Sequence, residues 1–274
     1  MGSSASRVTA FEHLSGLRPF HPAAVQLMSI SSESDSAIED FERVFKSDPA
    51  LTADLLLMAN SAGFGMRMRV TTIRHALSLL GLERVRGLAV NIMLAGYLRA
   101  QPMGHVRAIW LHSVATAVAA EALGEIYGLS GMYTLGLMHD LGRLALLSNR
   151  GTRYADALAA EVADIEEAIE LETSVCGMNH CDAGALLAST WGFSQVFQVC
   201  MLDHHGTRRS RPAANPIELI RAACSMADCL GYPEVKWKER QSPVAMPQGV
   251  VESPHLAPER MLRLIHEQAA ILVS

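Results

Sequence analysis

The stretch Leu137-Met138-His139-Asp140-Leu141-Gly142-Arg143 sets a histidine beside a carboxylate in an otherwise apolar run. Burying a carboxylate among leucines is costly unless a cation or several hydrogen-bond donors compensate its charge. We therefore expect the pair to lie in one helix over residues 134–147, directed into the interior. Adjacent helical positions diverge by about 100°, so the two side chains either flank one metal ion or lie along a pair of ions.

Further histidines and carboxylates occur on both sides of this pair, each in an apolar segment with helical character. Taken alone, His112 is better explained as a buried core histidine than as a ligand. The order along the chain, H, HD, H, HH, D, changes that interpretation, because helices that converge imidazoles and carboxylates on one point form two-metal sites. The predicted metal ligands are His112, His139, Asp140, His180, His204, His205 and Asp228.

This series resembles the signature of the HD superfamily of metal-dependent phosphohydrolases, which includes the HD-GYP phosphodiesterases. The amino-terminal third resembles the HDOD domain, an HD-related output module of bacterial signalling proteins. The resemblance covers residues 15–235. Its amino-terminal part rests on four segments, Asp48-Pro49-Ala50-Leu51-Thr52-Ala53, Ala59-Asn60-Ser61-Ala62, Thr72-Ile73-Arg74-His75-Ala76-Leu77 and Leu80-Gly81.

Composition and resemblance together predict an all-α protein. Half of the 274 residues are hydrophobic but only 5% are aromatic, a bias that favours helix over sheet. The resemblance implies an HD-like helical bundle with an additional amino-terminal helical bundle. We expect an amino-terminal subdomain over residues 1–100, an HD-like subdomain over 101–235, and a linker with a final helix over 236–274.

Charge and cysteine content narrow the class of protein. The net charge of −5 argues against a general nucleic-acid binder. A helix–glycine turn–helix pattern over residues 77–85 offers Arg84 and Arg86 but no row of base-reading side chains, so helical packing is favoured over DNA contact. The five cysteines lie in apolar helical stretches and indicate reduced thiols. Because the longest uncharged apolar run, 87–98, is too short to span a membrane, we expect a cytoplasmic protein without membrane contact.

The resemblance also implies roles within the site. Asp140 would bridge two divalent ions, with His112, His139 and Asp228 on one ion and His180, His204 and His205 on the other. Iron, manganese or a similar transition metal suits such histidine-rich ligation better than magnesium. In an enzyme, Asp140 and Arg143 would be catalytic. The candidate phosphate-binding residues are Arg143, Arg208 and Arg209.

Departures from the catalytic relatives decide the preferred hypothesis. HD-GYP phosphodiesterases carry a lysine where Arg143 stands, and their Gly-Tyr-Pro loop is absent after His205. HDOD domains are usually described as signalling modules without demonstrated catalysis. We therefore expect a regulatory output module that binds signalling proteins, with or without a metal centre. The alternatives are an active phosphohydrolase acting on a nucleotide or cyclic dinucleotide and, third, a DNA-binding regulator.

Overall fold

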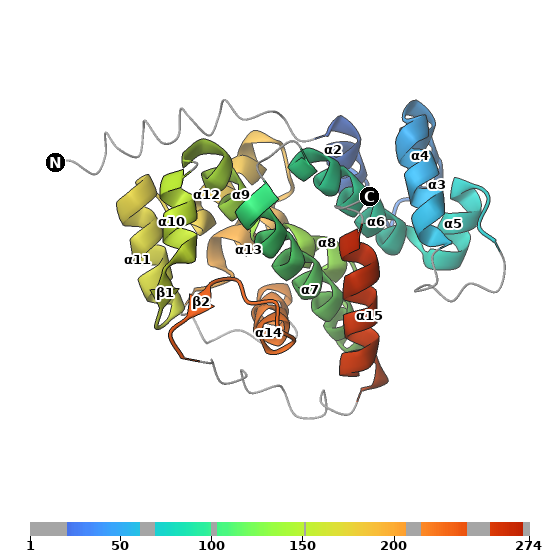
Figure 1. The fold of residues 1–274 in the computed structure, drawn as a ribbon. Coiled ribbons are helices and arrows are strands. Elements are labelled where there is room, and N and C mark those ends of the chain that lie inside the picture. Colours follow the sequence, from blue (N-terminus) through green and yellow to red (C-terminus); the bar gives the residue numbers. More distant parts are fainter. Residues whose placement is uncertain are drawn as a thin grey trace.

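The fold is all-α, which confirms the prediction from composition. The computed structural model describes residues 21–60, 69–99, 103–150, 152–206, 215–239 and 253–270. Helices occupy most of these ranges (Figure 1). Within them the strands are β1 (Glu161–Val162) and β2 (Lys236–Trp237), which form one short parallel pair.

The centre of the molecule is α7 (Met103–Tyr127), which contacts α8, α9, α14 and α15. Among the described residues, the segment His105–Tyr127 of this helix is long and apolar enough to cross a membrane, but 78% of its most apolar 18-residue stretch is buried inside the protein. A helix at the centre of a folded core is buried to this extent, so its apolar character is explained by packing. The helices in contact with α7 are α8 (Met132–Met138), α9 (Leu141–Arg150), α14 (Pro216–Cys229) and α15 (Pro258–Ala269). Two further helices, α12 (His180–Thr190) and α13 (Gln195–Asp203), contact each other, and they pack on α9 and on α8 and α14 respectively.

Local capping signals mark the limits of the amino-terminal helices. Asp48 caps one helix by accepting from Leu51 N at 3.0 Å, and Thr72 caps another by accepting from His75 N at 3.1 Å. Gly81 follows that second helix with φ of 81°, a backbone conformation that side chains with a Cβ rarely adopt. The helices are α2 (Pro22–Ser29), α3 (Ala37–Ser47), α4 (Pro49–Ala59), α5 (Ile73–Leu80) and α6 (Leu82–Arg99).

The two arginines of the helix–turn–helix pattern are engaged within the protein. Arg86 donates to the Glu83 carboxylate at 2.9 Å and to the backbone oxygen of Ile30. Arg84 lies 3.6 Å from the Glu121 carboxylate. These contacts are those of a helix packed in a bundle.

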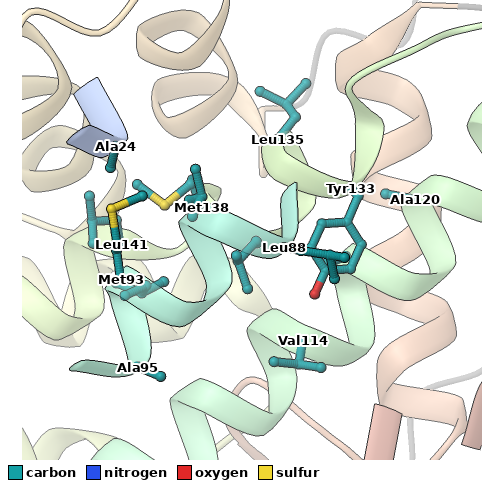
Figure 2. Packing of buried hydrophobic residues seen from close by; sticks show 14 of the residues in the cluster. Ala24, Leu88, Met93, Ala95, Val114, Ala120, Tyr133, Leu135, Met138 and Leu141 are labelled. Carbon is teal, nitrogen blue, oxygen red and sulfur yellow. The ribbon is translucent and has the colours of Figure 1, made fainter. Parts of the chain in front are cut away.

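One apolar cluster joins the amino-terminal helices to the rest. Figure 2 shows Ala24 of α2 and Met93 of α6 close to Met138 of α8 and Leu141 of α9. The last helix belongs to the same cluster, since Trp110 Nε1 donates to Ala269 O at 3.2 Å. The predicted subdomain boundaries at residues 100 and 235 stay predictions.

The single helix predicted over residues 134–147 is wrong. The helix ends at Met138 and a new one begins at Leu141, so His139 and Asp140 occupy the junction. Nδ1 of His139 donates to the backbone oxygen of Gly136 at 2.6 Å. In a continuous helix, this oxygen would accept from the backbone N of Asp140. The site's own hydrogen bonding thus interrupts the helix that its hydrophobic pattern predicted.

The amphipathic stretch 156–171 is not one continuous helix. The chain forms α10 (Thr152–Ala159), then β1, then α11 (Ile165–Cys176). Asp164 caps α11 by accepting from Glu167 N at 2.8 Å, and Glu167 reaches back to Ala163 N at 2.6 Å. This reciprocal capping is a helix-start signal that the hydrophobic period concealed.

Candidate metal centre

Five elements bring the predicted histidines together. His112 lies on α7, His139 and Asp140 at the α8–α9 junction, and His180 in the first turn of α12. His204 and His205 follow the end of α13. Their rings form a continuous row, with centroids 5.4 Å apart for His112 and His139, 5.0 Å for His139 and His204, and 5.3 Å for His204 and His180.

Three of these imidazoles are held in one tautomer by backbone carbonyls. Nδ1 of His112 lies 2.8 Å from Tyr232 O, Nδ1 of His139 lies 2.6 Å from Gly136 O, and Nδ1 of His204 lies 2.9 Å from Met201 O. A carbonyl oxygen can only accept, so each Nδ1 carries the proton and each Nε2 keeps its lone pair. Three deprotonated Nε2 atoms therefore face the interior of the site, the form in which histidine binds a metal.

His180 is oriented by a carboxylate instead. Glu172 Oε2 accepts from Nδ1 of His180 at 2.6 Å and from its backbone N at 2.9 Å, which leaves Nε2 3.5 Å from Asp140 Oδ1. The other oxygen, Oε1, accepts from the Tyr154 hydroxyl at 2.9 Å and from Arg143 at 2.7 Å. Carboxylates that orient ligand histidines in this way are a regular feature of metal sites.

Arg143 is the only guanidinium among the described residues that contacts Asp140. Its Nε donates to Asp140 Oδ2 at 2.8 Å, and its other nitrogens reach Glu172 at 2.7 Å and Glu234 at 3.2 Å. The side chain is fully buried. The phosphate-binding role predicted for Arg143 stays a prediction, but in this structure its donors serve carboxylates. Arg208 and Arg209 lie outside the described residues.

The electrostatics of the site favour a bound cation. Burial alone would raise the pKa of Asp140 and Glu172, but Arg143 and His180 hold the pKa of Asp140 well below its usual range and that of Glu172 at about 2. Burial also lowers the pKa of His139 to about 4 and that of His204 well below its ordinary value. His139 and His204 are thus neutral, whereas the raised pKa of His180 makes this ring a cation in the metal-free site. Arg143 and His180 face three ionised carboxylates, those of Asp140, Glu172 and Glu234, which leaves negative charge to be balanced.

Two buried acceptor atoms of the site lack hydrogen-bond donors, as the ligands of a metal ion would. Asp140 Oδ1 and His204 Nε2 are buried and make no hydrogen bond, although they lie only 3.7 Å apart. Both are acceptors, so the pair is unfavourable unless a cation lies between them. Ligand atoms of Asp140, His180, His204 and His205 all lie within 4.8 Å of one another. The buried cluster could therefore hold a metal ion.

The structure gives Asp228 a different position from the other six predicted ligands. Its Oδ2 accepts from Trp237 Nε1 at 3.0 Å and its Oδ1 accepts from Glu234 N at 3.2 Å. It approaches the Nδ1 side of His112, at 3.8 Å, and so lies behind that ring. Burial and the neighbouring Glu234 raise the pKa of Asp228 to about 6. Asp228 is in neither ligand group that contains His112, and its predicted ligand role stays a prediction that this placement does not favour.

Sequence reasoning missed three side chains of the site. Glu172 shares the buried face of α11 with Ala168 and Cys176, and this four-residue spacing could have revealed it. Cys224 precedes Asp228 by one turn of α14 and was interpreted only as a buried thiol. Glu234 follows α14 in a short loop, where no periodicity could reveal it.

Comparisons with known proteins agree with this fold. A family model for the HDOD domain matches residues 17–207. An uncharacterized protein of Treponema pallidum (strain Nichols) is 25% identical over 192 residues, which are 67% of this chain and 36% of that protein. The chain therefore spans little more than a third of the length of this curated relative.

Three solved structures share the architecture. An HDOD domain protein of unknown function from Geobacter sulfurreducens has a TM-score of 0.71 at 22% identity, covering 97% of each chain. A candidate phosphohydrolase from Shewanella amazonensis SB2B has a TM-score of 0.67 at 20% identity, covering 99% of this chain and 97% of that one. A candidate signal transduction protein from Marinobacter aquaeolei VT8 has a TM-score of 0.69 at 18% identity, covering 99% of this chain and 66% of that one. At these identities the likeness concerns the fold.

Proposed function

This chain belongs to the HDOD domain family, and from that premise we propose that it is a regulatory module of signal transduction. It acts through protein partners in the cytoplasm and holds metal in its buried His/Asp cluster. The Marinobacter neighbour, described as a candidate signal transduction protein, supports the same class of function.

The observation that carries this proposal is the closure of the site. His112 and Asp140 are 0% exposed, and His139, His180 and His204 are 1% exposed. A hydrolase must bring a phosphoryl group into contact with its metal and with the cations that stabilise it. Here the guanidinium of Arg143 is buried among Asp140, Glu172 and Glu234, so it serves the interior of the site.

Metal in this setting has a structural and regulatory role. Asp140, His180, His204 and His205 would hold one ion, and iron, manganese or a similar transition metal suits these ligands. Binding of metal to the folded state alone stabilises that state by mass action. Two ions were expected from the sequence, and the second position is treated in the next subsection.

Partner proteins have apolar side chains to contact at the amino-terminal helices. Leu57 of α4 is 71% exposed and Leu79 of α5 is 48% exposed. The helices α4 and α5 contact each other and lie at one end of the molecule in Figure 1. Exposed leucines on neighbouring helices are a common feature of protein-binding surfaces.

An active phosphohydrolase is the second candidate. It is favoured by the row of imidazoles with deprotonated Nε2 atoms, and the Shewanella neighbour is described as a candidate phosphohydrolase. When bound, transition metals would supply the Lewis acidity for hydrolysis of a phosphate ester. The substrate would be a nucleotide or a cyclic dinucleotide.

Metal content and turnover, measured on the same purified full chain, separate these functions. We expect bound transition metal by elemental analysis and no chelator-sensitive hydrolysis of cyclic di-GMP, of nucleotides or of bis(p-nitrophenyl) phosphate. Turnover that chelator removes and that Asp140→Asn abolishes would replace the regulatory proposal by the enzymatic one. A protein that neither contains metal nor takes it up would refute the metal-holding part of both.

A further inference from the structure

Cys224 places a sulfur atom beside the histidine row. Its Sγ lies 3.2 Å from Nε2 of His139. Ligand atoms of His112, His139 and Cys224 all lie within 4.8 Å of one another, and all three side chains are buried. Two ligand atoms bound to one zinc at about 2.0–2.3 Å lie on the order of 3.5 Å apart, so this cluster has the dimensions of a metal position.

We propose that Cys224 is a metal ligand, which with His112 and His139 forms a second ion position beside that of Asp140, His180, His204 and His205. This inference rests on the proposed metal-holding function. The second position then has two imidazole nitrogens and one sulfur, where the sequence predicted His112, His139 and the Asp228 carboxylate.

Geometry favours Cys224 over Asp228 for this role. Both lie on the same face of α14, one turn apart. Asp228 approaches His112 from the Nδ1 side, and that nitrogen donates to Tyr232 O. Cys224 faces the Nε2 side of His139, where the lone pair is free of any carbonyl partner. The sulfur is therefore on the metal-binding side of the ring, and the Asp228 carboxylate is not.

A sulfur ligand sets the metal preference of this position. The thiolate is the ligand form, so coordination releases the thiol proton to solvent. Thiolate with imidazole selects zinc, cobalt(II) or iron(II) over magnesium and manganese(II), which prefer oxygen ligands. The position formed around Asp140 has one oxygen and three nitrogen ligands, which are harder ligands than a thiolate. The two positions are thus chemically distinct, and the one with Cys224 takes the softer ion.

Cobalt(II) titration of the metal-free full chain tests the inference, because a thiolate ligand produces a sulfur-to-cobalt charge-transfer absorption in the near ultraviolet. We expect the wild type to bind two equivalents of cobalt(II) and to show this band. Cys224→Ser should lose the band and bind one equivalent. Cys200→Ser is the matched control, since Cys200 is also buried, at 0% exposed against 6% for Cys224, but belongs to none of the ligand clusters. This variant should keep both the band and the second equivalent.

A second measurement requires no variant and covers the case in which Cys224→Ser fails to fold. X-ray absorption of the zinc-loaded wild type should show a sulfur scatterer in the zinc coordination shell. Cobalt or zinc bound without sulfur, with Cys224→Ser unchanged in stoichiometry, would overturn the inference and leave the metal-holding proposal in place; Cys224 would then be a core thiol donating to His139. A wild type that binds neither metal would overturn both.

Discussion

The Asp140 carboxylate is divided between two environments by Arg143. Nε of Arg143 donates to Oδ2 at 2.8 Å, whereas Oδ1 is buried without a hydrogen bond and faces His180 Nε2 at 3.5 Å. One oxygen is therefore neutralised within the protein and the other is available to a cation. This division means that Asp140 contributes to stability with and without metal, so tests of the site must separate the two contributions.

Asp140→Asn separates them, because asparagine keeps an oxygen for Arg143 but loses the charge that binds metal. For the metal-loaded wild type, we expect chelator to lower Tm by roughly 5–10 °C, since ligand at 100 times its Kd stabilises by about 2.7 kcal/mol. The Tm of Asp140→Asn should respond less to chelator than that of wild type, because only the position formed by His112, His139 and Cys224 remains to hold metal. Thermal unfolding of both proteins with and without EDTA measures this, and equal responses would exclude Asp140 as a ligand.

Asp140→Ala is less informative than Asp140→Asn. Removing one carboxylate from a buried ion pair leaves the charge of Arg143 uncompensated, so we expect this variant to be destabilised with or without metal.

Glu172→Gln should destabilise the protein by roughly 3 kcal/mol, because it removes a charge that Arg143 and His180 share in the interior. Urea unfolding at pH 7 in the presence of chelator measures the loss without a metal contribution. Glu170→Gln is the matched control on the exposed face of the same helix, and its free energy of unfolding should stay within about 0.5 kcal/mol of wild type. Equal effects of the two variants would contradict the bridging role of Glu172.

The metal-free protein should lose stability as pH falls from 6.5 to about 4.5. Burial lowers the pKa of His139 from 6.5 to about 4, so in this window the unfolded chain binds a proton that the folded chain does not. Unfolding therefore becomes easier with acid, by up to about 3 kcal/mol for His139. His204, also lowered, acts in the same direction, whereas His180, whose pKa is raised despite burial, acts in the opposite one.

The contribution of His139 is isolated by His139→Asn, which cannot take up the proton. Urea unfolding at pH 7.0, 5.5 and 4.5 with chelator should give a shallower loss of free energy for the variant than for wild type. Parallel curves for the two proteins would show that His139 does not remain neutral in the folded state.

Gly142→Ala should destabilise the fold by about 3 kcal/mol or more, because α9 and α12 meet backbone to backbone at this residue. A Cβ there would lie 1.8 Å from His180 O and 2.7 Å from Gly184 N, and backbone neighbours cannot move as a side chain can. Gly96→Ala is the control, since a Cβ at that helical position has no atom within 4 Å. It should raise stability by up to about 1 kcal/mol in the same urea measurement.

The sequence by itself determined the helical class, most helix limits and the identity of the histidines that converge. These properties follow from local rules. Asp48 and Thr72 cap the helices that they precede, apolar residues recur at helical spacing, and an order of histidines on successive apolar helices has few explanations other than a shared site.

Only the tertiary structure decided how charge is arranged within the site. The predicted helix is interrupted at His139–Asp140, and Asp228 lies behind His112. Arg143 pairs with the carboxylates of Asp140, Glu172 and Glu234, two of which the sequence did not predict as parts of the site. The physical reason is that a side chain's periodicity reports which face is buried, whereas its partner across the core depends on how separate helices pack. Glu234 and Arg143 are distant in sequence and meet only because α14 and α9 are both anchored on α7.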